Sequence, residues 1–173
     1  ERLASAVARS YFKLLSYKDE YEVARLHTDK AFLNGVKDDF GSSAKLEFRL
    51  APPLLGGKRD ARGRPLKKQF GAWIVPLFRV LASMRRLRGT PFDVFGYTAE
   101  RRMERQLIAD FEDTVAGLLT QLDAGNRDAA AGIVEQYLDI RGFGPVKEAS
   151  VAQVEKRIAA MLDDFTKTEA EAA

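Results

Sequence analysis

Residues 98–122, TAERRMERQLIADFEDTVAGLLTQL, are the stretch that decides the fold. Apolar residues recur in it every three or four positions, which places them along one face of an α-helix. Thr98 is a residue type that caps helix N-termini, and Glu100 suits the positively polarised first turn. We therefore predict a long amphipathic helix, whose buried face should consist of Met103, Leu107, Phe111, Val115, Leu118 and Leu122.

The same apolar spacing predicts further helices on both sides of this stretch. Gly35 and the run DDFGSS, residues 38–43, should break the pattern of the second helix. Ser150 and Gln153 have the spacing of a capping box, which marks the start of the last helix. The predicted helices cover about residues 2–15, 16–32, 76–88, 126–140 and 150–165.

The predicted helix at residues 76–88 has recognisable ends. Pro76 suits the first turn of a helix, and Gly89 is a common stop signal. We expect the buried side of this segment to be lined by Trp73, Leu77, Leu81 and Met84.

One segment alternates in the manner of a β-strand. In KLEFRL, residues 45–50, every second side chain is apolar and the others are charged. Two prolines then end the strand, and LKKQF, residues 66–70, can return as its antiparallel partner. The predicted fold class is therefore mainly α, with about five or six amphipathic helices and one β-hairpin at about residues 44–70, in a single domain over residues 1–173.

The composition excludes several classes of protein. The chain contains no cysteine, which rules out disulfides and cysteine-ligated iron–sulfur clusters within it. The absence of cysteine also fits a cytoplasmic protein, and because no apolar run approaches the roughly 20 residues of a membrane span, we expect no membrane partner. The one histidine, His27, is too little for a zinc site and is expected to be structural or on the surface.

Charge is distributed unevenly. Residues 58–105 contain thirteen Lys or Arg and four Asp or Glu, a balance of +9, so the other residues must carry −6 of the total +3. Either the basic middle contacts an anionic partner, or the two charged regions face each other within the fold. Nucleic acid is disfavoured because no helix-turn-helix, zinc-finger or RNA-recognition signature is present.

The densest basic cluster lies at the expected hairpin tip. We predict it either as a solvated loop or as a contact for an anionic partner. Its members are Lys58, Arg59, Arg62, Arg64, Lys67 and Lys68.

A second candidate surface lies in LRGTPFDVFGYTAERRMER, residues 87–105. Proline restricts the backbone there, and we expect three aromatic side chains to be buried between two helix ends, with arginines on the exposed rim. This predicted docking corner, a structural or interdomain contact, consists of Pro91, Phe92, Phe95, Tyr97, Arg101 and Arg102.

Five segments taken together resemble a known family. They are YFKLLSYKDEYEVARL, FRLAPPLL, FGAWIVPLFRVL, LRGTPFDVFGYTAERRMER and DIRGFGPVKEA, in this order. The chain resembles, over roughly residues 3–165, the C-terminal region of bacterial single-chain indolepyruvate ferredoxin oxidoreductases, members of the 2-oxoacid:ferredoxin oxidoreductase family.

The resemblance implies a parent enzyme with thiamine diphosphate, magnesium and iron–sulfur clusters that oxidatively decarboxylates aryl pyruvates to acyl-CoA. The chain lacks the G-D-G signature of thiamine-diphosphate sites, so no catalytic, cofactor-binding or metal-binding residue is carried over. We expect a non-catalytic accessory domain excised from a much longer enzyme. Its partners would be the remaining domains of that enzyme, with ferredoxin or coenzyme A as further candidates. The alternative is an autonomous helical module that binds an anionic partner, such as an acidic protein, a nucleotide or a nucleic acid.

Overall fold

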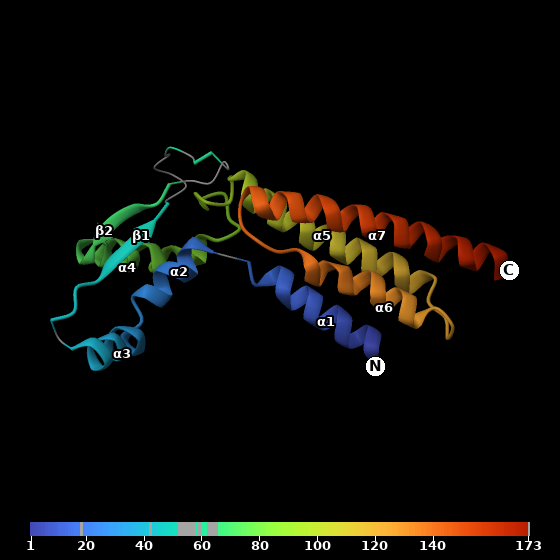
Figure 1. Cartoon of the computed structure of the whole chain (residues 1–173), viewed down its shortest axis with the longest axis horizontal. Coiled ribbons are helices and arrows are strands. Elements are labelled where there is room, and N and C mark those ends of the chain that lie inside the picture. Colours follow the sequence, from blue (N-terminus) through green and yellow to red (C-terminus); the bar gives the residue numbers. More distant parts are fainter. Residues whose placement is uncertain (18, 42, 52–57, 59, 62–65, 173) are drawn as a thin grey trace. The chain divides into compact units, whose positions relative to one another are not determined.

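The computed structural model describes residues 1–17, 19–41, 43–51, 58, 60–61 and 66–172 (Figure 1). They separate into two compact units. The helical unit comprises Glu1–Tyr17 and Arg102–Ala173, and the mixed unit comprises Lys18–Arg101. The expectation of a single accessory domain stays a prediction, and each unit is described by itself.

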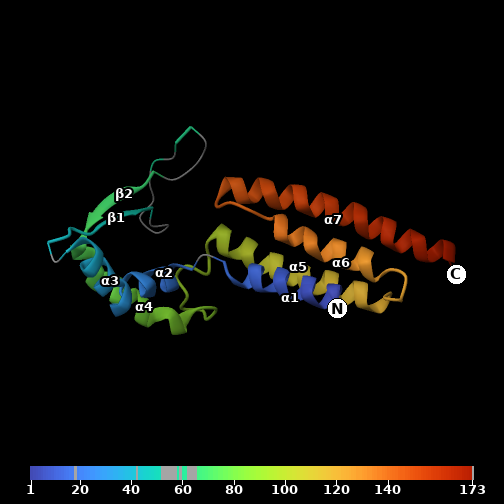
Figure 2. The same ribbon diagram turned by 60° about the horizontal axis from the view of Figure 1, so that its bottom comes forward.

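Four helices make up the helical unit. In Figures 1 and 2, α1 (Arg2–Leu15), α5 (Ala99–Thr120), α6 (Arg127–Glu135) and α7 (Pro145–Ala172) lie side by side. The 3-10 turn η4 (Gln136–Asp139) follows α6. Their apolar faces enclose one core, in which the most deeply buried side chains include Leu107, Phe111, Ile133, Val134 and Val154.

The predicted face of α5 is confirmed. Leu107, Phe111 and Leu118 are buried in the core, and Met103, Val115 and Leu122 pack against it. The Oγ1 atom of Thr98 accepts a hydrogen bond from the Arg101 N–H at 3.3 Å, as expected of an N-cap.

Two polar contacts are buried in the helical unit. The Ser10 hydroxyl, fully buried on α1, donates to the Val134 carbonyl oxygen at 3.0 Å. The Lys147 ammonium on α7 lies 2.5 Å from the Glu104 carboxylate on α5, and these side chains are only 14% and 5% exposed. Each of these three buried polar side chains therefore has a partner, as the interior of a protein requires.

The mixed unit contains three helices and a small sheet. The helices are α2 (Glu20–His27), α3 (Lys30–Phe40) and α4 (Val75–Ser83), with 3-10 turns η2 (Ala72–Ile74) and η3 (Met84–Leu87) at the two ends of α4. Strands β1 (Glu47–Leu50) and β2 (Lys68–Gly71) pair antiparallel, with Phe48 opposite Phe70. The predicted hairpin and the mainly α class are confirmed, with seven α-helices and one two-stranded sheet among the described residues.

A second core holds the mixed unit together. Phe48 from β1, Ile74 from η2 and Phe78 from α4 meet Ala24 of α2 in it. Leu46 and Leu50 pack against this core on the same side as Phe48, as the alternation in the sequence predicts.

One predicted helix is in fact two. Residues 16–32 do not form a single helix, because Asp29 starts α3: its carboxylate accepts from the Ala31 N–H at 2.9 Å and from the Phe32 N–H at 3.3 Å. Gly35, expected as a breaker, lies inside α3. Glycine costs about 1 kcal/mol in a helix, which the side-chain cap can offset. The helix ends at Gly41, whose φ of +81° suits glycine.

The prediction of the buried side of α4 was wrong for Trp73 and Leu77. Ile74 and Phe78 face the core, while Trp73 and Leu77 are 69% and 57% exposed. Apolar side chains lie on both faces of this short segment, so the spacing alone could not select the inward face.

The last helix begins earlier than predicted. Helix α7 starts at Pro145, in its favoured first-turn position, and not near Ser150. The Ser150 hydroxyl instead accepts from the Arg141 N–H at 3.0 Å and donates to the Asp139 carbonyl oxygen at 3.3 Å. Across the described ranges, no helix is both long and apolar enough to cross a membrane.

Candidate functional site

The loop at residues 88–98, here called the corner loop, is built from consecutive turns. Backbone hydrogen bonds run from Asp93 N–H to Thr90 oxygen at 3.0 Å, from Gly96 N–H to Asp93 oxygen at 3.0 Å, and from Thr98 N–H to Phe95 oxygen at 3.1 Å. Gly89 begins the loop with φ +74°, a conformation that favours glycine. Each turn satisfies backbone groups locally, so the loop has a defined course without belonging to a helix or a strand.

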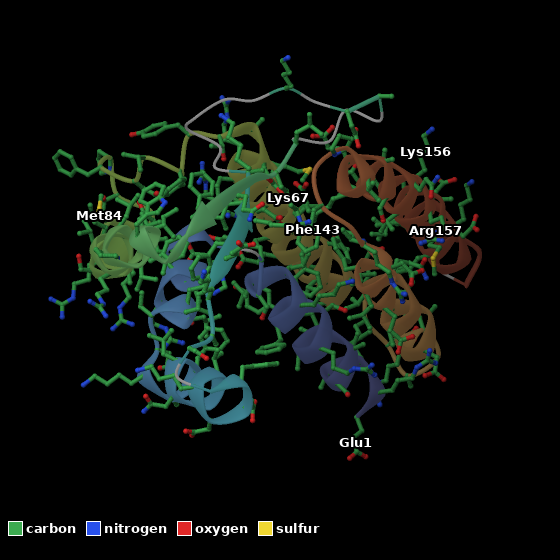
Figure 3. All side chains as sticks on the ribbon, turned by 60° about the vertical axis from the view of Figure 1, so that its left-hand side comes forward. Glu1, Lys67, Met84, Phe143, Lys156 and Arg157 are labelled. Atoms are coloured by element: carbon green, nitrogen blue, oxygen red, sulfur yellow. The ribbon has the colours of Figure 1, made fainter. Side chains whose placement is uncertain are left out.

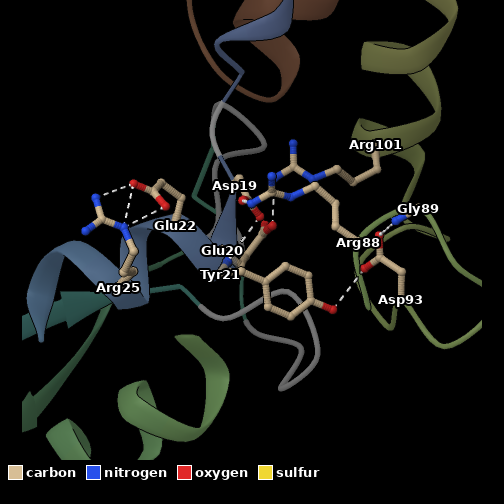
Figure 4. Close-up of polar contacts among 9 residues, drawn as sticks. All are labelled: Asp19, Glu20, Tyr21, Glu22, Arg25, Arg88, Gly89, Asp93 and Arg101. Atoms are coloured by element: carbon tan, nitrogen blue, oxygen red, sulfur yellow. Dashed lines mark hydrogen bonds and ion pairs between the residues drawn. The ribbon is translucent and has the colours of Figure 1, made fainter. Parts of the chain in front are cut away.

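A buried carboxylate fixes the corner loop from inside. Asp93 is only 5% exposed, and its side chain accepts from the Gly89 N–H at 3.0 Å, the Tyr21 hydroxyl at 3.0 Å and the Phe95 N–H at 3.2 Å (Figure 4). A Cβ atom on Gly96 would lie 3.0 Å from an Asp93 carboxylate oxygen. A larger residue at position 96 would therefore crowd the carboxylate that holds the loop.

The hydrogen bonds and the burial shift both titrations in this pair. Burial by itself acts to raise the pKa of the Asp93 carboxyl, but hydrogen bonds from Gly89, from Tyr21 and from the neighbouring backbone outweigh it and leave the pKa below its usual value. Burial, reinforced by the hydrogen bond to Asp93, raises the pKa of Tyr21 to about 12. Asp93 is therefore ionised and Tyr21 neutral at pH 7.

Two ion pairs connect the start of α2 to Arg88, at the beginning of the corner loop, and to Arg101, in the first turn of α5. Arg88 pairs with Asp19, whose carboxylate also caps α2. Arg101 pairs with Glu20 at 2.6 Å, with these side chains 8% and 21% exposed (Figure 4). The expectation of Arg101 on an exposed rim was therefore wrong, because a buried guanidinium needs a carboxylate partner and α2 supplies one. Arg102 is exposed as expected, and it belongs to the helical unit.

The aromatic residues of the corner loop point in different directions. Phe95 is 6% exposed and meets the Tyr21 ring edge-on at 5.2 Å between centroids. Phe92 and Tyr97 are 74% and 65% exposed, and the Tyr97 hydroxyl donates to the Pro91 carbonyl oxygen at 2.8 Å. Of the three aromatic residues expected to be buried, only Phe95 is. The turns alternate the direction of successive side chains, so Asp93 and Phe95 point inward and Phe92 and Tyr97 outward.

The predicted basic tip is only partly within the described residues. Lys58, Lys67 and Lys68 are exposed, and the Leu66 N–H donates to the Lys58 carbonyl oxygen at 2.9 Å. Lys68 stands opposite Leu50 in the strand register. The other three members, Arg59, Arg62 and Arg64, lie outside the described residues, so the tip as an anionic contact stays a prediction.

His27 packs among aromatic rings. Its ring stacks on Phe78 at 5.5 Å and meets Phe48 edge-on at 5.2 Å. Burial lowers the pKa of His27, which favours the neutral imidazole. Of the two roles expected for His27, structural or on the surface, its ring contacts favour the structural one, although the side chain is only half-buried.

The corner loop depends on residues that the sequence did not reveal. Tyr21, Asp19 and Glu20 lie 72, 69 and 81 positions from their partners, and no local pattern indicates such pairings. Asp93 did carry a signal, because an aspartate that bonds the N–H two residues later is typical of a turn. That pattern indicates the turn but not the buried tyrosine that shares the carboxylate.

The family of the chain was identified by comparison with known proteins. No curated protein and no solved structure matches the chain. The model of one family, described as a family of unknown function (DUF6537), matches residues 1–160. Because this match spans nearly the whole chain and includes both units, the chain belongs to the DUF6537 family.

Proposed function

We propose that the chain is a non-catalytic C-terminal docking domain of a cytoplasmic indolepyruvate:ferredoxin oxidoreductase. In this proposal the parent enzyme carries thiamine diphosphate, magnesium and iron–sulfur clusters and converts aryl pyruvates to acyl-CoA. The support for that parent is the resemblance of five sequence segments, which together span about residues 3–165. The support for a docking role comes from the corner loop.

The residues of this chain do not fit the cofactors of such an enzyme. The sequence contains no cysteine to ligate a cluster. Within the described residues, no group of three His, Cys, Asp or Glu side chains is placed to hold a metal ion. We therefore assign no step of the decarboxylation to this chain and expect the remaining domains of the parent enzyme to supply the chemistry.

The observation that carries the docking role is the exposure of Phe92 and Tyr97 on a fixed loop. Large aromatic side chains provide much of the binding energy at interfaces, and they lose little entropy on binding when their backbone is already ordered. The Asp93 hydrogen bonds and the Tyr97 hydroxyl bond to Pro91 supply that order. The corner loop thus has the properties of a preorganised anchor for another protein surface.

The test is made in the full-length parent enzyme. Phe92→Ala and Tyr97→Ala are introduced together, and Phe40→Ala serves as the matched control, since Phe40 is also 74% exposed and lies in the same unit. We expect the double variant to fold normally but to lower indolepyruvate-dependent ferredoxin reduction at least tenfold or to destabilise the assembled enzyme. Its far-ultraviolet circular dichroism and its cofactor content separate folding from docking.

The possible outcomes distinguish the parts of the proposal. Normal activity and assembly in the double variant would refute docking through the corner loop. A parent protein that reduces no ferredoxin with any aryl pyruvate would refute the proposed enzyme, whatever the variants do. An equal loss in Phe40→Ala would show a general surface effect and would also count against the corner loop.

The basic tip has a separate test in the same enzyme. Ferredoxin, the phosphates of coenzyme A and an acidic neighbouring domain are its candidate partners. Charge reversal at Lys58, Lys67 and Lys68 should raise the KM for ferredoxin or for coenzyme A, or weaken assembly, at low salt. Because exposed charges are screened beyond about 8 Å at physiological ionic strength, the effect should shrink as salt rises. Values equal to those of the unmodified enzyme at low salt would show that these lysines are only solvated.

A further inference from the structure

A shallow open depression lies where α2 meets the end of α4 and the turn η3. Its volume is about 460 Å³, and it is lined by Arg25 of α2, by Ala82 and Ser83 of α4, and by Arg85 and Arg86 of η3. Three of these five residues are arginines, and the only apolar one is Ala82. The lining therefore suits a polar anion better than an apolar ligand, which needs mostly apolar walls.

The depression is supported by the packing beneath it. Ala24, the neighbour of Arg25 on α2, is buried in the mixed-unit core, and Ala82 packs against the same core. The backbone segments that carry the arginines are thus held by the contact between α2 and α4 before any ligand arrives. Such preorganisation reduces the entropy that is lost on binding.

The charge available to a ligand comes from Arg85 and Arg86. Both side chains are exposed, and neither makes a hydrogen bond or an ion pair within the part of the chain that the structure describes. Figure 3 shows Met84, the residue before them, at the outer edge of the α4–η3 segment. The Ser83 hydroxyl donates to the Val80 carbonyl oxygen at 2.6 Å, so it is not free to donate to a ligand.

Arg25 is already occupied by a carboxylate. Its Nε atom lies 2.9 Å from both carboxylate oxygens of Glu22, and its Nη2 atom lies 2.6 Å from one of them (Figure 4). The hydrogen bond from Arg25 lowers the pKa of Glu22, and the charges of Arg25, Arg88 and Arg85 contribute to this shift. Glu22 is therefore ionised at pH 7 and competes with an external anion for the positive charge of Arg25 and Arg85.

Positive charge around the depression exceeds negative charge by two. Arg79, which is exposed, lies one helical turn before Ala82 and Ser83 and therefore on the same side of α4. The arginines of this region are Arg25, Arg79, Arg85, Arg86 and Arg88, and the carboxylates that pair with them are those of Asp19, Glu22 and Asp29. Five positive and three negative charges leave a surplus of +2.

We infer that this depression binds the phosphomonoester group of a small molecule. Such a group carries a charge of about −1.5 to −2 at pH 7 and has three acceptor oxygens, which matches the surplus charge. Guanidinium groups bind phosphate oxygens through pairs of parallel hydrogen bonds, so Arg85 and Arg86 together can neutralise the group. The volume of the depression lies within the range of about 300–1,000 Å³ that is usual for small-molecule sites.

Other roles for these arginines fit less well or need no ligand. A carboxylate supplies a single negative charge, and Glu22 already provides one. A nucleic acid offers phosphodiesters with one charge each, so it leaves part of the surplus unmatched at each phosphate. Arginines near the end of a helix also stabilise it through the helix dipole, and this role would leave the depression without affinity for phosphate.

This inference goes beyond the proposed function. It uses neither Phe92 and Tyr97 nor the basic tip, and it holds whether or not the parent enzyme is the proposed oxidoreductase. Failure of the corner-loop test leaves the depression unaffected, and the reverse is also true.

The test compares three adenosine compounds that differ at the phosphate. Adenosine monophosphate has a monoester, its 3′,5′-cyclic form has a diester, and adenosine has no phosphate. Binding to the full chain is measured at low salt by calorimetry, and NMR follows the Nε–H groups of the arginines. We expect the monoester to bind at least about tenfold more tightly than the diester, and adenosine not to bind. The signals of Arg85 and Arg86 should shift with the monoester, and inorganic phosphate should displace it.

Variants locate the site. Arg85→Gln and Arg86→Gln should each weaken binding of the monoester about tenfold or more, because each removes hydrogen bonds to a charged group. Lysine at either position keeps the charge but loses the planar fork, so it should restore only part of the affinity. Arg49→Gln is the matched control, since Arg49 is an exposed arginine of β1 in the same unit, and it should leave binding nearly unchanged.

A gain of affinity separates binding from a structural defect. Glu22→Gln removes the competing carboxylate and frees Arg25. We expect it to strengthen binding about two- to threefold, the effect of one like charge about 8 Å away in water. A variant that merely disturbs the fold would not bind more tightly.

Four outcomes would overturn the inference. The first is equal binding of adenosine and its monophosphate, which would assign affinity to the base. The second is equal binding of the monoester and the diester. The third is an equal loss in Arg49→Gln, which would show a general effect of surface charge. The fourth is binding of duplex DNA without binding of the monoester, which would assign the arginines to nucleic acid.

Discussion

Replacing Asp93 with asparagine should destabilise the mixed unit by several kcal/mol although it hardly changes the shape of the side chain. One carboxylate oxygen accepts from the Gly89 N–H, and the other accepts from the Tyr21 hydroxyl and the Phe95 N–H. An asparagine has only one acceptor oxygen. In either orientation of its amide, the NH2 group faces a backbone N–H, that of Gly89 or that of Phe95.

The magnitude follows from this geometry. A buried donor left without a partner costs about 1–3 kcal/mol, and each of the two remaining hydrogen bonds loses about 1 kcal/mol when its acceptor loses the charge. The sum is about 3–5 kcal/mol, a large part of the 5–15 kcal/mol by which domains are typically stable. Asp39→Asn is the control, since Asp39 is exposed on α3 and should have little effect.

The assay is urea denaturation followed by Trp73 fluorescence, because the only tryptophan lies in the mixed unit and reports its unfolding. The pH dependence gives a second measurement. Since the folded pKa of Asp93 lies below its unfolded value of 3.8, its stabilisation is complete above pH 3.8 and is lost as the pH falls through the folded pKa. The difference between the wild type and Asp93→Asn should therefore shrink at acidic pH.

A loss below about 0.5 kcal/mol at pH 7 would refute the reasoning, because it would fall within the usual range of surface substitutions. A difference that stays constant down to pH 2 would show that the charge of Asp93 does not stabilise the fold.

Three further predictions concern packing, a buried ion pair and a histidine. Phe95→Ala should cost about 3–5 kcal/mol in urea denaturation, the range for a core phenylalanine, and a cost under 1 kcal/mol would mean that the ring is not packed. Glu104→Gln should destabilise the helical unit by about 3–5 kcal/mol, because it leaves Lys147 buried without a counter-charge. Replacing both residues with apolar ones should restore much of this stability, measured by thermal unfolding followed by circular dichroism. Because burial lowers the folded pKa of His27, the free energy of unfolding should fall as the pH drops from 6.5 through that pKa; His27→Phe should flatten this dependence, and an unchanged slope would contradict the assignment.

The sequence predicted an element and its buried face correctly where the apolar pattern allows only one inward face. In α5 the apolar residues gather on one face, with Leu119 as an exposed exception, so the spacing identified both the helix and its inward side. The strand at Glu47–Leu50 alternates strictly, which fixed the face of Phe48. The division into α2 and α3 depends on one capping aspartate, Asp29. The apolar spacing of the segment around it predicts a single helix.

The candidate site was less accessible to sequence analysis. Glycine and proline announced the turns of the corner loop, but which aromatic side chains point inward depends on the carboxylate of Asp93 and on Tyr21, 72 residues away. Likewise, an arginine next to glutamates in a predicted helix suggests an exposed side chain. Arg101 is buried because a distant carboxylate, Glu20, neutralises it.

The ion pairs of the mixed unit bear on one of the two interpretations that the basic middle of the sequence left open. Arg88 and Arg101 pair with acidic residues of α2, so part of the positive charge does face acidic residues inside the fold. Arg85 and Arg86 make no such pair within the described residues and line a shallow depression together with Arg25, Ala82 and Ser83. Pairing inside the fold therefore accounts for Arg88 and Arg101, and an anionic partner for the other arginines stays a prediction. A charge satisfied inside the unit cannot also attract a partner at full strength, and so we expect any anionic partner of the basic middle to meet residues other than Arg88 and Arg101.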